Sequence, residues 1–153
     1  MESSEDLRER ARRSLQVAEQ MLSKTYPIVN DPKLILAIAE DIYAALTSSM
    51  TALLVKKQEK MQISDDFSSI FTAFQQIAPD LSFQQDDLEI IKELSTIIAE
   101  HKDSPVEFPR KDKFIICDNE YKCTTITIDD MKSYLFRARL FVEKVNDALD
   151  KEQ

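Results

Sequence analysis

The chain has 153 residues, a formal net charge of −8 and 43% hydrophobic residues, and it contains no glycine. This length and apolar content are typical of one globular unit, so we expect residues 1–153 to form a single helical-bundle domain. The missing glycine excludes phosphate-binding loops, dinucleotide-binding turns and glycine-built nucleophile elbows, and the negative charge argues against a general coat for nucleic acid. No long uncharged apolar run and no signal peptide pattern is present, which predicts a cytoplasmic protein without a membrane span.

Two long amphipathic helices are predicted in the first part of the chain, where apolar residues recur at steps of three and four. The first covers residues 5–25 and is expected to end at Pro27. The second covers residues 32–60, with Asp31 as its N-cap and Pro32 at its first helical position. Its apolar face is wide enough to contact more than one neighbour.

Three further helices are predicted from their capping residues. Ser64 and the two aspartates after it open a short helix that Pro79 ends. Ser82 with Gln85 three residues later resembles a capping box for a helix that continues to about residue 102. Thr127, with Asp130 three residues later, caps the last helix.

Residues 103–127 differ from the rest because β-branched and aromatic residues are concentrated there. The runs 114–117 and 121–126 predict a small β-hairpin that packs on the helices through Phe114, Ile116 and Ile126. We therefore predict an all-α fold, an antiparallel bundle of about five helices with a small β-hairpin inserted before the last helix. Cys117 and Cys123 could face each other on the two strands and form a disulfide, but a cytoplasmic location favours two buried thiols.

Three segments resemble helices of HEPN domains, which are antiparallel helical bundles. The segments are Ala11-x-x-Ser14-Leu15-x-x-Ala18-Glu19-x-Met21-Leu22, Ile42-Tyr43-Ala44-Ala45-x-x-x-Ser49-x-x-Ala52-Leu53-Leu54 and Tyr134-Leu135-x-x-Ala138-x-x-Phe141. HEPN members that cleave RNA carry an Arg followed, after four to six residues, by His. His101 is the one histidine of the chain, and Leu94, Ser95 and Thr96 stand where its arginine would be.

The resemblance therefore implies a non-catalytic HEPN-like member. Such a member forms a homo-oligomer or pairs with a helical protein partner, such as a nucleotidyltransferase. The wide apolar faces of the second and last helices favour the same class, a non-enzymatic, homodimeric interaction module, because one bundle is not expected to cover both faces.

An alternative function rests on a concentration of positive charge around the predicted hairpin. Arg110, Lys111, Lys113 and Lys122 lie close in sequence to Phe114 and Tyr121. Basic residues interleaved with aromatic residues bind single-stranded nucleic acid through phosphate contacts and stacking. The competing interpretation is a solvated sheet edge, since lysines commonly protect such edges.

A second alternative is a hydrolase that uses His101 or carboxylates. The acidic residues are Glu40, Asp41, Asp65, Asp66, Asp86, Asp87, Glu89 and Glu93. Several of them fall in predicted first turns, where the helix dipole favours acids, and His101 falls at a helix end, where it favours a cation. No metal-binding spacing is present, so we predict no catalytic residue, no metal and no cofactor.

Overall fold

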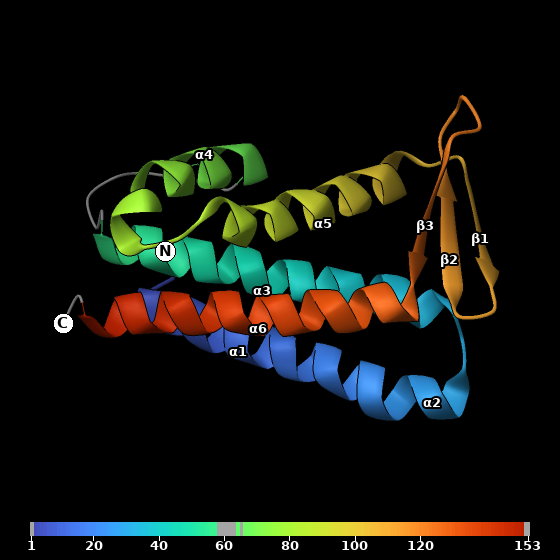
Figure 1. Cartoon of the computed structure of the whole chain (residues 1–153), viewed down its shortest axis with the longest axis horizontal. Coiled ribbons are helices and arrows are strands. Elements are labelled where there is room, and N and C mark those ends of the chain that lie inside the picture. The colour runs from blue at the N-terminus through green and yellow to red at the C-terminus, as the bar shows by residue number, and fades with distance from the viewer. Residues whose placement is uncertain (1, 58–63, 65, 152–153) are drawn as a thin grey trace.

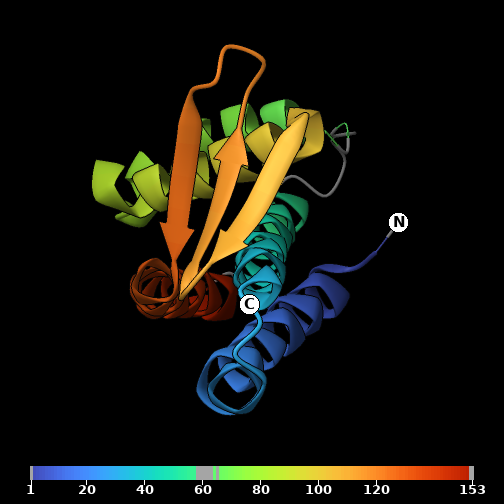
Figure 2. The same ribbon diagram turned by 90° about the vertical axis from the view of Figure 1, so that its right-hand side faces the viewer.

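The structure is a computed structural model that describes residues 2–57, 64 and 66–151. Long helices lie side by side, and a small sheet stands across one end of them (Figures 1 and 2). α1 and α5 run in the opposite direction to α3 and α6 (Figure 1). The prediction of a mostly helical fold with a small β element before the last helix is confirmed.

The first helix is longer than predicted because Pro27 does not end it. α1 (Ser4–Gln20) continues through the π-helical turn η1 (Met21–Thr25) into α2 (Tyr26–Val29). Proline has no N–H and its ring clashes with the preceding turn, and a wider π-helical turn relieves that conflict without breaking the helix. The chain turns only at Asn30, which has the left-handed conformation.

α3 (Lys33–Lys57) is the central helix and packs against α1, α4, α5 and α6. Asp31 caps it as predicted, because its carboxylate accepts a 3.0 Å hydrogen bond from the Lys33 amide. Residues 58–60 of the predicted helix lie outside the described part of the chain. Among the described residues, α3 alone is long and apolar enough to cross a membrane by length and composition, and 56% of its most apolar window is buried in the bundle. The packing of a core helix accounts for the same composition.

α4 (Phe67–Ile77) and α5 (Gln85–Asp103) form where predicted, but other residues cap them. Asp66 is the N-cap of α4, whereas Ser64 was expected to open this helix. Ser82 ends the short 3-10 turn η2 (Pro79–Leu81) in the left-handed conformation, and α5 begins after Gln84, with Asp87 completing the capping box. The predicted Ser82 capping box is therefore wrong.

The predicted hairpin is part of a three-stranded antiparallel sheet. Its strands are β1 (Val106–Arg110), β2 (Lys113–Cys117) and β3 (Cys123–Thr127), in the order β1-β2-β3. The extra strand β1 contains Pro109, which an edge strand tolerates because one side of such a strand needs no hydrogen-bond donors. β2 and β3 pack on the helices through Phe114, Ile116 and Ile126, all of them buried as predicted.

α6 (Ile128–Lys151) closes the bundle. Its capping box is the predicted one: Asp130 N donates to Thr127 Oγ1 at 3.0 Å, and Thr127 N donates to Asp130 Oδ2 at 2.9 Å. Leu46 and Leu53 of α3 are fully buried in the core that α6 completes.

Candidate functional site

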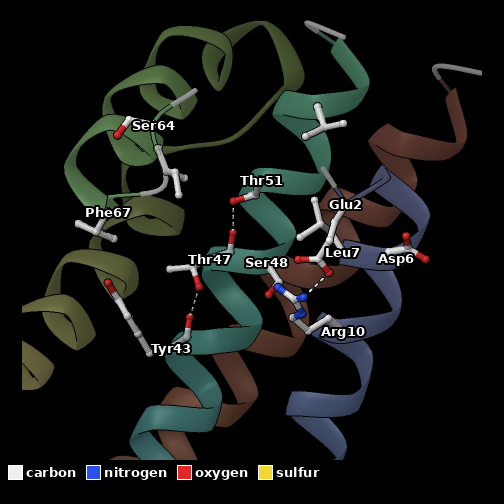
Figure 3. Close-up of a pocket in the computed structure, with 12 residues that line it drawn as sticks. Glu2, Asp6, Leu7, Arg10, Tyr43, Thr47, Ser48, Thr51, Ser64 and Phe67 are labelled. Atoms are coloured by element: carbon white, nitrogen blue, oxygen red, sulfur yellow. Dashed lines mark hydrogen bonds and ion pairs between the residues drawn. The ribbon is translucent and has the colours of Figure 1, made fainter. Parts of the chain in front are cut away.

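A groove with a volume of about 800 Å³ lies between α1 and α4, with α3 as its floor (Figure 3). Apolar side chains form part of each wall. Leu7 of α1 forms one side, Phe67 and Ile70 of α4 form the other, and Val55 lies on the floor. The volume is within the range of about 300–1,000 Å³ that is usual for small-molecule sites.

Hydroxyl groups follow the floor of the groove along α3. Thr47 donates to the Tyr43 carbonyl at 3.1 Å, and Thr51 donates to the Thr47 carbonyl at 2.8 Å (Figure 3). Because these hydroxyl protons are used by the helix backbone, each threonine oxygen can only accept a further hydrogen bond from a ligand.

Ser48 differs from these threonines. The residue is 7% exposed and lines the groove, and its side chain makes no hydrogen bond within the described part of the chain. Ser49, next to it, is 1% exposed and does not line the groove. Of the two buried serines of α3, Ser48 alone therefore presents a free hydroxyl to the groove.

One cation lines the groove among the described residues, the guanidinium of Arg10. It forms an ion pair with the Glu2 carboxylate, and Figure 3 shows the Ser48 side chain directed toward the same guanidinium. Asp6 also belongs to the lining, but its carboxylate accepts from the Ser3 amide in the α1 capping box and is turned away from the floor (Figure 3). The polar end of the groove thus consists of Arg10, Glu2 and Ser48.

Tyr43 closes the groove toward α5. Its ring lies 5.7 Å from the Phe67 ring, and burial raises the pKa of its phenol, so it is protonated at neutral pH. Neither Arg10 nor Ser48 was predicted as a site residue. The available signal was the polar run from Thr47 to Thr51 inside an otherwise apolar helix.

A second feature is the outer face of α6, where Phe136 is 62% exposed and Leu140 is 47% exposed. The two side chains share one face because they are one helical turn apart. Lys132 lies one turn before Phe136 and Glu143 one turn after Leu140, and both are exposed. The wide apolar face predicted for α6 is therefore partly exposed, whereas the apolar face of α3 is buried in the core.

The predicted basic residues lie at two opposite ends of the sheet. Arg110, Lys111 and Lys113 surround the β1–β2 turn, whereas Lys122 lies in the β2–β3 turn. The five-residue strand β2 separates the two ends by about 13 Å, at roughly 3.3 Å per residue. Lys122 instead lines a second cavity of about 660 Å³, together with acids that include Glu100 and Asp103. A single patch of four cations is therefore not formed.

The three cations at the β1–β2 turn are exposed and form no ion pair within the described part of the chain. The Arg110 guanidinium lies 4.6 Å from the centre of the Phe108 ring and donates to its neighbouring Pro109 carbonyl at 3.1 Å. These three residues remain open to an anionic partner, and Phe108 offers an aromatic surface beside them.

His101 and some of the acidic residues have structural partners. Nδ1 of His101 is 2.6 Å from Oε2 of Glu107, which links α5 to β1, and His101 lines neither of the two cavities described above. Asp87 binds Lys144 at 2.7 Å, and Glu93 binds Arg137 at 3.5 Å.

No metal site is found among the acids of the described residues. Burial, with a smaller contribution from the charge of Glu40, raises the pKa of Asp41. Asp65 lies outside the described residues, and within them no three acids, cysteines or histidines are grouped so as to hold a metal.

Cys117 and Cys123 form a disulfide across the β2–β3 pair, with Cα atoms 4.0 Å apart, so the expectation of two thiols is wrong. The pairing register places the two cysteines directly opposite each other, and Ser104 Oγ donates to the Cys117 carbonyl at 2.6 Å beside the bridge.

The chain matches no protein-family model and none of the curated proteins with which it was compared. Five of the six alanines of the HEPN-like segments are fully buried, namely Ala11, Ala18, Ala45, Ala52 and Ala138, and Ala44 is partly buried. Helices that pack closely need small residues at such positions, whatever the family to which they belong.

Proposed function

We propose that this protein is a non-enzymatic interaction module, similar to HEPN accessory proteins, that pairs with a second copy of itself through the outer face of α6. The observation that carries this proposal is the exposure of Phe136 and Leu140 on one face of a helix that is otherwise well packed. Large exposed apolar side chains that lie together are typical of protein interfaces.

The charges on either side of this apolar pair favour a second copy as the partner. A two-fold axis between Phe136 and Leu140 places each Phe136 against the Leu140 of the other copy, in an antiparallel pair of α6 helices. Lys132 of one copy then lies near Glu143 of the other, so opposite charges meet on both sides of the apolar centre. A stable dimer buries about 1,200 Å² or more, so the neighbouring surfaces of α1 and α5 must also contribute.

The mass of the protein in solution tests the proposal. Sedimentation equilibrium of the full chain is expected to give the mass of a dimer. The Leu140→Glu variant is expected to give the mass of a monomer, with the same helix content by circular dichroism as the wild type. Val106→Glu is the matched control because Val106 is similarly exposed, at 51%, but lies on β1 in the sheet and not on α6, α1 or α5. A monomeric wild-type protein would overturn the proposal.

A charge exchange distinguishes the two-fold arrangement from nonspecific association. Lys132→Glu alone should weaken the dimer, and adding Glu143→Lys should restore it, since the pair then has its charges reversed. If the double variant stays as weak as the single one, the antiparallel arrangement is wrong. A helical partner such as a nucleotidyltransferase, which the resemblance implies, would use the same face and compete with the dimer.

A second candidate function is binding of single-stranded nucleic acid at the β1–β2 turn. The observation that favours it is the set of unpaired cations Arg110, Lys111 and Lys113 beside Phe108. Phosphate contacts and aromatic stacking are the two elements such binding needs.

A further inference from the structure

The groove between α1, α3 and α4 contains a buried polar group that the fold does not use. Ser48 is 7% exposed, yet its hydroxyl makes no hydrogen bond within the described residues. A buried hydroxyl without a partner is unfavourable, and most helical serines avoid this by bonding to the preceding turn, as Thr47 and Thr51 do here. Ser48 is thus placed to donate a hydrogen bond to a group inside the groove.

The guanidinium beside Ser48 is already held by a carboxylate. Arg10 pairs with Glu2, the side chains of both residues being about half exposed at 48% and 43%. A guanidinium presents its donors as a planar fork that matches the two oxygens of a carboxylate. The carboxylate of Glu2 therefore occupies the position that the carboxylate of a ligand would take, and exchanging one for the other leaves the charge of the pair unchanged.

The rest of the lining is mixed: Thr47 and Thr51, whose hydroxyl protons are used by the backbone, lie on the floor, and apolar side chains beside them provide a surface for an aliphatic chain. Leu7, Val55, Phe67 and Ile70 line the groove from three different helices. A singly charged head group fits better than a phosphate dianion, because Glu2 and Asp6 border the site and the protein carries a net charge of −8.

We propose that this groove binds a medium-chain monocarboxylic acid, with its carboxylate on Arg10 and Ser48 and its aliphatic chain along Leu7, Val55 and Ile70. Glu2 then acts as an internal competitor that the ligand displaces. This inference does not rest on the α6 interface, because neither Phe136 nor Leu140 lines the groove.

Calorimetric titration of the full chain with octanoate tests the assignment. Saturable binding is expected, and Arg10→Met and Ser48→Ala should each weaken it by about tenfold, because each removes a donor to the ligand charge. The matched controls are Arg12→Met and Ser49→Ala. In the wild type, the Arg12 guanidinium is likewise paired with a carboxylate, that of Glu9 on α1, and Ser49 is the adjacent buried serine outside the groove. Both controls should bind octanoate as the wild type does.

The internal competitor gives a prediction in the opposite direction. Glu2→Gln should tighten octanoate binding by about threefold or more, because the neutral amide competes less well for Arg10. A purely structural role of the Arg10–Glu2 pair would leave the affinity unchanged or lower it.

Two related probes identify the head group. Octanol and octylamine carry the same aliphatic chain as octanoate and should bind at least about tenfold more weakly, because neither supplies the anion that Arg10 requires. Equal binding of octanol, stronger binding of octylamine, or no saturable octanoate binding to a folded wild-type protein would each overturn the proposal.

Discussion

The phenol of Tyr26 donates a 2.7 Å hydrogen bond to Oδ1 of Asp112, which joins α2 to the β1–β2 turn across 86 residues of sequence. The Asp112 carbonyl also accepts from the Ile128 amide at 3.1 Å, at the start of α6. Asp112 adopts the left-handed conformation, with φ 58°, which lets the turn reach both neighbours. One residue thus ties the sheet to the first and the last helix of the bundle.

This contact predicts a loss of stability at alkaline pH. Burial and the hydrogen bond to Asp112 raise the pKa of Tyr26 from 10.0 to about 12. Because the folded state favours the protonated phenol, the stabilisation is complete below the ordinary pKa and is lost as the pH rises from about 10 to about 12. Denaturant unfolding across this range should show the loss in the wild type and a smaller one in Tyr26→Phe. Tyr121→Phe, at a side chain that is 90% exposed, is the control and should behave as the wild type.

The centre of the core gives a prediction of large effect. Leu46 is fully buried on α3, so Leu46→Ala should lower the free energy of unfolding by about 2–5 kcal/mol through lost burial and a residual cavity. Val17→Ala, at a half-exposed position, should cost much less. A loss below about 1 kcal/mol for Leu46→Ala in chemical denaturation would contradict the core position.

The sequence predicted the elements whose signals are local. Asp31, Thr127 and Asp130 cap helices as expected, since a cap depends on residues two or three positions apart. Pro27 was misjudged for a related reason. It looks like a breaker by itself, but a π-helical turn accommodates it. The strand β1 was not predicted, and its edge position tolerates Pro109.

The groove could not be predicted because its parts come from separate helices. Arg10 and Ser48 are 38 positions apart, and the polar residues between Thr47 and Thr51 do not by themselves show which side chains line a groove or that Arg10 lies beside them. The grouping of Lys122 with Arg110 failed for the opposite reason, because residues close in sequence are held apart by an extended strand. Proximity in a folded chain follows the pairing of elements, which residue spacing alone does not reveal.

The disulfide predicts a measurable contribution to stability. Cys117 and Cys123 are six positions apart, and closing so short a loop stabilises the fold by about 2 kcal/mol in the chain-entropy model. The double variant Cys117→Ser with Cys123→Ser should unfold at a lower denaturant concentration. A reducing agent should produce the same shift in the wild type and none in the double variant. Equal midpoints for oxidised and reduced wild type would show that the bridge contributes nothing.

The β1–β2 turn gives the prediction that decides the second candidate function. A triple variant with Glu in place of Arg110, Lys111 and Lys113 should no longer bind a labelled oligouridine, because the phosphates then meet three negative charges. The melting temperature should change little, since these exposed side chains form no ion pair within the described residues and the stacking of Arg110 on Phe108 contributes only about 0.5–1 kcal/mol. For the wild type, three phosphate contacts predict a slope of about −2 when log affinity is plotted against log salt concentration.

Lys122→Glu, at the opposite end of the sheet, is the control and should leave affinity and slope unchanged. Loss of binding with Lys122→Glu alone, or an unfolded triple variant, would remove the turn as a nucleic-acid site.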